Sequence, residues 1–171
     1  MREKEKALEH DELLALLDYD PETGVFRHKR HIPPLAEIGS VAGCIRDNRY
    51  RQINVNGRLY RAHRLAWFYM HRQWPPHDID HINGNRDDNR IVNLRLATRS
   101  ENLRNSGMRK DNTSGLKGVS WHAGAKKWVA QIKVEKTEKS RYLGLFKTKE
   151  GAHAAYRAAS AQYHGDFGRT D

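Results

Sequence analysis

The residues best suited to chemistry in this 171-residue chain lie between positions 78 and 102. Residues 78–85 read DIDHINGN, so Asp80 directly precedes His81. Neighbouring residues near the end of a strand send their side chains in different directions, so one of the pair can bind a metal ion while the other faces a substrate. Two asparagines follow, Asn93 thirteen and Asn102 twenty-two residues after Asp80. One short stretch therefore combines a carboxylate, an imidazole and two side-chain amides.

Two elements are predicted to position these groups. A hairpin-like unit spans residues 79–97 and carries the Asp-His pair. A short helix begins near Thr98, because Thr98 and Glu101 have the spacing of a capping box. Asn102 falls in the first turns of this helix, where its position can be held rigidly.

The region before the hairpin is predicted to mix short helices and strands. Asn56-Gly57 is typical of a tight hairpin turn, because this dipeptide supplies the positive φ angles that such a turn needs. Pro21 ends the first helix, because proline cannot continue one. The predicted elements are a helix over 8–20, strands over 24–28, 50–55 and 58–61, and a helix over 62–71.

Residues 105–113 are polar and rich in Gly, Ser and Asn, which predicts a linker. Beyond it the sequence predicts three alternating strands and one Ala-rich helix, which make a small α+β unit. These elements are expected over 118–121, 127–134, 140–145 and 148–164. The predicted domains are therefore 1–104, the linker 105–113, and 114–171.

The charge of the chain favours a polyanionic partner. Lys and Arg number 31 and Asp and Glu 21, a net charge of +10 with His neutral. Residues 21–110 hold 17 basic and 8 acidic side chains, and residues 111–171 hold 11 and 6, so two separate regions carry the excess. A flexible polybasic tail would show as one block of like charges, and the sequence has none.

Composition also excludes several classes of protein. No apolar run approaches the roughly 18 residues of a membrane span, and the charged start of the chain does not resemble a secretory signal. The single cysteine, Cys44, forbids an internal disulfide and a zinc cluster of two or more cysteines, and is expected to be a small core residue. We expect an intracellular, cytoplasmic protein without a membrane partner, in the cytoplasm of the host cell if it is encoded by a phage.

The ordered set of residues resembles the HNH endonucleases, specifically the phage homing-endonuclease branch. The match covers about 40 residues, and its strength lies in the order and spacing of several short elements. The elements appear here as His63-Arg64-Leu65, residues 80–85 (DHINGN), Asn93-Leu94-Arg95 and Glu101-Asn102.

This resemblance implies a ββα-metal (His-Me finger) core, in which two strands and a helix clasp one divalent cation. It implies that Asp80 and Asn102 are the metal ligands, and that His81 is the general base. Asn93 would brace the loop and hold the His81 ring. Oxygen ligands suit Mg²⁺ or Mn²⁺, one per active site, better than zinc. The implied reaction hydrolyses DNA phosphodiester bonds to 5′-phosphate and 3′-hydroxyl ends, and His63 is expected to be structural.

The C-terminal region resembles the Apetala2/ethylene-response-factor type of DNA-binding domain over nearly all of residues 114–165. The matching elements are residues 114–119 (SGLKGV), 127–132 (KWVAQI), 142–146 (YLGLF) and 150–156 (EGAHAAY). The resemblance implies a three-stranded sheet in the major groove with the helix packed behind it. Trp128, Leu143 and Phe146 are then expected in the core.

Seven residues of this region are expected to face DNA. Lys117, Lys133 and Arg141 would reach phosphates, and Gln131 would read a base edge. Ser120 and His122 stand where plant members usually have arginine, which leaves the preferred sequence open. The full set is Lys117, Ser120, His122, Gln131, Lys133, Arg141 and Tyr142.

The sequence thus predicts a homing-type DNA endonuclease with double-stranded DNA as partner and no small-molecule cofactor. Alternatives remain. A non-catalytic DNA-binding regulator with a degenerate nuclease fold would explain the charge, and so would an RNA-binding protein. Taken singly, Asp80 and Asn93 read as turn residues, and Asn102 as an exposed helix residue. The basic hairpin over 50–61 either follows the DNA backbone or is a solvated surface, and the oligomeric state is open.

Overall fold

The computed structural model of the chain describes residues 5, 7–34, 36–46, 49–134 and 139–170. The chain divides into two compact units, Met1–Ala97 and Thr98–Asp171. This division lies before the boundary predicted at residue 104, because helix α3 (Arg99–Arg104) contacts residues of the second unit. No helix in the described part of the chain has the length and apolar character needed to cross a bilayer.

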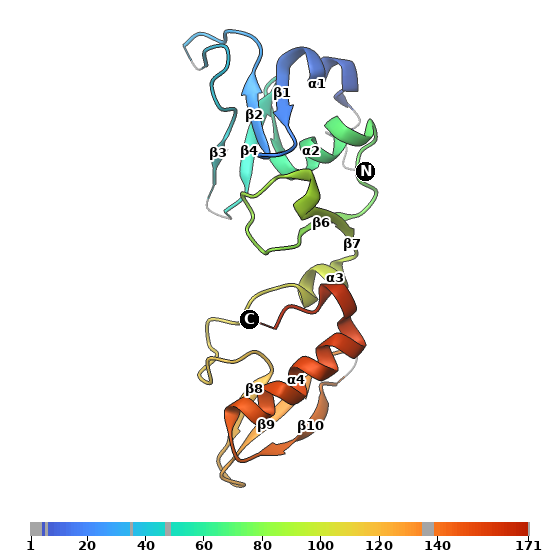
Figure 1. Cartoon of the computed structure of the whole chain (residues 1–171). Helices are drawn as coiled ribbons and strands as arrows, with labels where there is room; N and C mark the ends of the chain where they lie inside the picture. The colour runs from blue at the N-terminus through green and yellow to red at the C-terminus, as the bar shows by residue number, and fades with distance from the viewer. Residues whose placement is uncertain (1–4, 6, 35, 47–48, 135–138, 171) are drawn as a thin grey trace. The chain divides into compact units, whose positions relative to one another are not determined.

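The first unit combines short antiparallel sheets with two helices (Figure 1). Strand β1 pairs with β2, β3 with β4 and β4 with β5, and β6 pairs with β7. In chain order the elements are α1 (His10–Leu16), β1 (Leu17–Asp20), β2 (Val25–His28), β3 (Cys44–Ile45), β4 (Arg51–Val55), β5 (Arg58–Arg61), α2 (Ala62–His71), β6 (Asp78–His81), the 3₁₀ turn η2 (Ile91–Asn93) and β7 (Leu94–Ala97). These small antiparallel sheets and helices agree with the predicted α+β class.

Local sequence signals place most of these elements. Asn56 and Gly57 have φ angles of 50° and 76° and connect β4 to β5, as predicted. The predicted first helix is too long, because α1 ends at Leu16 and the chain continues as strand β1. Alternate burial of Leu17 and Tyr19 against exposure of their neighbours explains the change, since a period of two is that of a strand.

Residue Cys44 corrects a second expectation. It lies in the short strand β3 and is exposed, not buried in the core. The neighbouring Ala42 is the buried residue of this segment, at 0% exposure. A small apolar residue fits either environment, so composition alone did not decide between the two.

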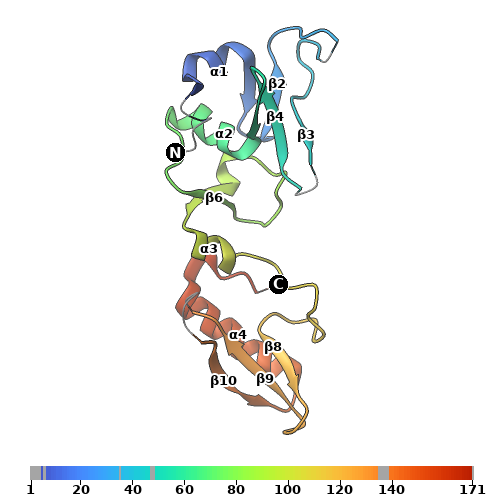
Figure 2. The same ribbon diagram turned by 180° about the vertical axis from the view of Figure 1, so that it is seen from behind.

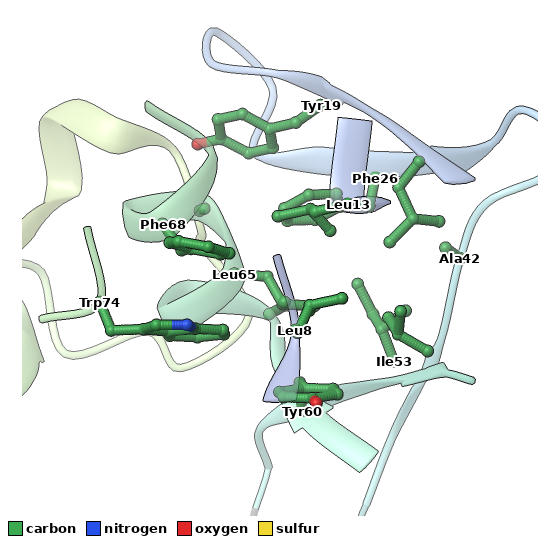
Figure 3. Packing of buried hydrophobic residues seen from close by; sticks show 14 of the residues in the cluster. Leu8, Leu13, Tyr19, Phe26, Ala42, Ile53, Tyr60, Leu65, Phe68 and Trp74 are labelled. Atoms are coloured by element: carbon green, nitrogen blue, oxygen red, sulfur yellow. The ribbon is translucent and has the colours of Figure 1, made fainter. Parts of the chain in front are cut away.

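The core of the first unit is a layer of aromatic and aliphatic side chains between α1, α2 and the sheets (Figure 3). Trp74 stacks on Phe68 with a centroid distance of 4.3 Å, and on Tyr60 at 5.8 Å. Leu13 and Leu65 are fully buried beside them. This packing fixes α2 against β4 and β5, and therefore fixes the start of α2, where His63 lies.

A buried ion pair fastens the N-terminal segment to α2. Arg64 Nε donates to Glu5 Oε1 at 2.6 Å and Arg64 Nη2 to Glu5 Oε2 at 2.9 Å. The same guanidinium donates to the carbonyl oxygens of His77 and Pro75, at 3.0 and 3.1 Å. Arg64 therefore has a structural role, because its bonds hold the chain that leads into β6.

The second unit is a three-stranded antiparallel sheet covered by one long helix. Its elements are α3 (Arg99–Arg104), β8 (Val119–His122), β9 (Lys127–Ile132), β10 (Arg141–Phe146), α4 (Lys149–His164) and the 3₁₀ turn η3 (Gly165–Phe167). The sheet order is β10-β9-β8, and α4 contacts all three strands. Helix α4 lies across one face of the sheet, and Figure 2 shows the sheet from the other side. Three strands and a helix are thus confirmed.

The core of the second unit lies between this sheet and α4. Val119 and Ala130 are buried against Ala152, with Trp128, Leu143 and Phe146 partly buried around them. The expectation that these three large residues pack in the core is therefore confirmed. Small alanines on α4 let the helix approach the sheet closely.

Candidate active site

Asp80 forms an ion pair with a residue of the neighbouring strand. Strands β6 and β7 pair Asp80 with Arg95. Arg95 Nε and Nη2 donate to Asp80 Oδ2 at 2.9 and 2.8 Å. Asp80 is 4% exposed, so its charge is stabilised mainly by this guanidinium and less by water. The pair fixes the orientation of the carboxylate.

His81 is the last residue of β6, and its side chain lies among other rings. Consecutive residues of a strand face opposite sides, so the imidazole points away from the Asp80–Arg95 pair. The His81 ring lies 5.0 Å from the His63 ring in an edge-to-face arrangement and 5.9 Å from Tyr50. It is buried, with 4% exposure. The fold thus brings the start of α2 beside the end of β6.

Burial is the main influence on the pKa of His81. Desolvation lowers the pKa of its imidazole below the usual value, and this effect outweighs the opposing influences of Asn89, Asp80 and Asp88. A lowered pKa favours the neutral ring near pH 7. A neutral imidazole is the form that can accept a proton.

Asn93 closes the loop between β6 and β7. Its Oδ1 accepts from the backbone N–H of Asn83 at 3.0 Å. Its Nδ2 donates to Asn83 Oδ1 at 3.1 Å and to the Asp88 carbonyl at 2.8 Å. Asn93 is buried, so these bonds replace those that its amide would make with water. The structure therefore places Asn93 as a brace of the loop.

The polar neighbour of the His81 ring is Asn89, which the sequence did not indicate. Asn89 Oδ1 lies 3.5 Å from His81 Nε2, a long contact, and Asn89 is 1% exposed. Tyr19 donates to the Asn89 carbonyl at 2.7 Å. A β-carbon at Gly24 would lie only 2.4 Å from Arg90 N, so this close approach of the β1–β2 turn requires glycine.

Two further ion pairs hold the loop. Arg51 Nε and Nη2 donate to the carboxylate of Asp87 at 2.9 and 3.1 Å. Hydrogen bonds from Arg90 lower the pKa of Asp88 to about 2, against the opposing effect of burial, and Asn83 Nδ2 donates to the same carboxylate. Arg51, expected to follow DNA or face solvent, thus supports the loop.

Asn102 lies in the second unit, in the first turns of α3. The predicted capping box is present, because Glu101 N donates to Thr98 Oγ1 and Thr98 N to Glu101 Oε2, at 3.2 and 2.7 Å. The structure describes the units of Asp80 and Asn102 separately, so their joint binding of one ion stays a prediction. Over the described ranges there is no group of three or more His, Cys, Asp or Glu side chains that could hold a metal. The predicted ligands, the carboxylate of Asp80 and the side-chain amide of Asn102, are not a group of that kind.

The sheet of the second unit has a face turned away from α4. Val119 and Ala130 point to the helix, so the alternate positions point outward. This outward face carries Ser120 and His122 of β8, and Gln131 paired with Tyr142. Tyr142 is 64% exposed. We call these four residues the outward face.

Two of the three cations expected to reach phosphates, Lys117 and Arg141, lie off this face. Lys117 Nζ donates to the carbonyl oxygens of Arg104, Ser106 and Arg169 at 2.9, 2.6 and 2.8 Å. Arg141 pairs with the buried Ile132, and its guanidinium lies 5.0 Å from the Tyr163 ring of α4. Lys133 follows the last residue of β9, and it is exposed. The alternation of side chains along β10 explains why Arg141 lies on the helix side of the sheet. No local sequence signal distinguishes Lys117 from a surface lysine.

Several residues near His81 were missed or undervalued by sequence reasoning. His63 was expected to be structural, but its ring adjoins His81. The guanidinium groups of Arg61 and Arg86 lie 4.7 and 4.9 Å from the Tyr50 ring centroid. Arg86 brings positive charge near the imidazole, which further lowers the pKa of His81. The His-Arg-Leu element pointed to His63 and the basic hairpin over 50–61 to Arg61, whereas no sequence signal pointed to Arg86.

Replacing Asn93 by Ala should open the loop. The Asn83 amide would lose its acceptor and the Asp88 carbonyl its donor, so the free energy of local opening should fall by about 1–3 kcal/mol. Hydrogen exchange of the Asn83 amide, measured by NMR, should become at least about tenfold faster. Asn54→Ala, at an exposed position of β4, is the matched control. Unchanged exchange at Asn83 would show that Asn93 does not brace the loop.

Comparison with known proteins places this site in a known type of domain. Residues 60–104 match the family model described as HNH endonuclease. The chain is also 46% identical over 57 residues to Protein 3.8 of Escherichia phage T7, a match that covers 33% of this chain and 47% of the phage protein. The chain thus aligns with about half the length of this curated relative. No solved structure matches it significantly. The similarity to HNH endonucleases therefore lies in residues 60–104, the segment that holds Asp80, His81, Asn93 and Asn102.

Proposed function

We propose that this protein is a divalent-metal-dependent DNA endonuclease of the homing type. Residues 60–104 perform phosphodiester hydrolysis, and the second unit binds double-stranded DNA and directs the enzyme to its target. One observation carries the proposal. Within the segment that matches the HNH endonuclease model, an oriented carboxylate, Asp80, directly precedes a buried His81 whose lowered pKa favours the neutral ring.

His81 is the general base of the proposed reaction. Its neutral imidazole takes a proton from a water molecule, and the hydroxide formed attacks phosphorus. The bond from phosphorus to the 3′ oxygen breaks, which leaves a 5′-phosphate and, after protonation, a 3′-hydroxyl. Asn89 and Asn93 are positioning residues, because they hold the ring and the loop that follows it.

Asp80 and Asn102 are the proposed ligands of one cation. Both supply oxygen donors, which fit Mg²⁺ or Mn²⁺. A carboxylate offers about four acceptor sites, so the bonds from Arg95 to Oδ2 do not exhaust Asp80. When bound, the cation supplies positive charge beside the scissile phosphate and the leaving 3′ oxygen. Arg95 keeps the carboxylate in one orientation.

The second unit supplies DNA affinity through the outward face. Gln131 and Tyr142 lie opposite each other on neighbouring strands, so an amide and an aromatic hydroxyl are offered together to base edges or the backbone. Lys127, paired with His122, adds a positive charge at one end of this face. Since Lys117 and Arg141 lie elsewhere, we assign phosphate contacts on this face to Lys127 in their place and keep Lys133 as a predicted contact. A separate DNA-binding unit beside a nuclease segment fits a homing-type enzyme, whose cleavage must be directed to one site.

Plasmid cleavage tests the catalytic assignment. Supercoiled DNA with Mg²⁺ or Mn²⁺ should be nicked or linearised, and His81→Ala should reduce the rate at least about 100-fold, since a general base contributes that much or more. DNA binding by this variant should survive. His31→Ala, in an exposed loop of the same unit, should cleave normally. Cleavage by His81→Ala at the normal rate would refute the assignment. Binding without cleavage by the unmodified protein would favour the non-catalytic regulator.

Binding measurements test the outward face. Gln131→Ala and Tyr142→Ala should each weaken binding to duplex DNA by roughly tenfold, because each removes a contact at the centre of the interface. Gln162→Ala changes the same residue type at an exposed position of α4 and should leave affinity unchanged. Equal losses from Gln131→Ala and Gln162→Ala, or none from either, would show that DNA does not bind this face.

A further inference from the structure

Three rings from separate elements of the first unit pack against one another. Tyr50 directly precedes β4, His63 is the second residue of α2, and His81 ends β6. The ring centroids of Tyr50 and His63 lie 5.2 Å apart, those of Tyr50 and His81 5.9 Å, and those of His63 and His81 5.0 Å. All three distances fall within the roughly 4.5–7 Å at which aromatic pairs attract. The proposed reaction uses only one of these rings, that of His81.

The orientation of the His81 imidazole depends on its neighbours. The torsion that turns a histidine ring about its own axis has broad preferences, so the side chain does not select one orientation by itself. Asn89 Oδ1 lies 3.5 Å from His81 Nε2, and a contact of that length holds a ring only weakly. A general base must nevertheless stay aligned, because small displacements of a catalytic group are costly. Packing against other rings supplies a further constraint.

His63 is better placed than Tyr50 to supply this constraint. The planes of the His63 and His81 rings meet at 86°, which is the favourable edge-to-face arrangement. The Tyr50 ring is farther from His81 and tilted at 46° to it. His63 is 3% exposed, whereas Tyr50 is only partly buried. Because protein interiors are close-packed, a buried ring such as that of His63 has little room to move.

The start of α2 fixes the His63 ring. Ala62, Leu65 and Ala66 of this helix are fully buried in the core of the first unit, where Figure 3 labels Leu65. The helix also contacts β4 and β5, so its first turn cannot shift without disturbing the core. His63 therefore links the imidazole of His81 to the rigid core of the unit.

We propose that His63 is a positioning residue for His81. Its ring packs edge-to-face with the His81 imidazole and keeps that imidazole in the orientation in which it accepts a proton from water. His63 itself takes no proton from water and does not contact the scissile phosphate. This inference rests on the proposed function, in which His81 is the general base. The restraint on the His81 ring can nevertheless be measured without cleavage.

NMR relaxation dispersion of the His81 ring signals in the whole protein tests this restraint. His63→Leu fills the site without a flat ring and should introduce microsecond-to-millisecond exchange of the His81 ring, whereas His63→Phe keeps a ring and should not. His71→Leu is the matched control. His71 lies in the same helix, roughly 12 Å farther along its axis, and its ring packs on Trp67 at 4.2 Å. A His81 ring that stays free of exchange in a folded His63→Leu variant would overturn the proposal.

Cleavage kinetics supply the second test. His63→Leu should lower kcat by about tenfold or more and leave KM for plasmid DNA unchanged, because it displaces the base without removing a DNA contact. His63→Phe and His71→Leu should keep kcat within about threefold of the unmodified protein. Thermal unfolding checks that each variant folds, and a folded His63→Phe variant that has lost cleavage would by itself contradict the proposal. No cleavage by the unmodified protein would refute the proposed function instead, and the ring exchange would still decide whether His63 restrains His81.

Discussion

The pairing of β6 with β7 is the constraint on which the candidate site depends. It sets Asp80 opposite Arg95, and the ion pair between them stabilises a carboxylate that is almost wholly removed from water. The alternation of a strand then turns His81 to the other side, among the His63 and Tyr50 rings. Two neighbouring residues thus receive opposite environments. One is a fixed anion, and the other is a buried imidazole whose neutral form is favoured.

Much of the first unit fixes the positions of Asp80 and His81. The core packs α2 against β4 and β5 and so fixes His63, while the bonds from Arg64 to the carbonyl oxygens of Pro75 and His77 hold the segment that leads into β6. Asn93 and the Arg51–Asp87 pair close the loop after His81. Because burial of charged and polar groups is stabilising only when each is paired, these contacts act together. Loss of any one is expected to loosen the loop before it unfolds the unit.

Sequence reasoning succeeded where the signal is local and failed where it depends on tertiary packing. The Asn56-Gly57 turn, the capping box at Thr98 and the three alternating strands of the second unit follow from neighbouring residues. Strand β1 was taken for helix, because leucine spacing near residue 17 fits both periods. The contact of Asn89 with His81 joins residues eight apart through a folded loop, and no pattern marks it. Lys117 and Arg141 have the composition of DNA contacts but are held by carbonyls and by an aromatic ring.

Binding of Mn²⁺ followed by NMR tests the central claim most directly, since a paramagnetic ion broadens the signals of residues close to it. The account predicts that Mn²⁺ broadens the backbone amides of residues 79–82 together with that of Asn102, and that Asp80→Asn abolishes this effect. Asp11→Asn, at a fully exposed position of α1, should change nothing. Broadening that persists in Asp80→Asn, or that centres on other parts of the chain, would contradict the proposed metal site.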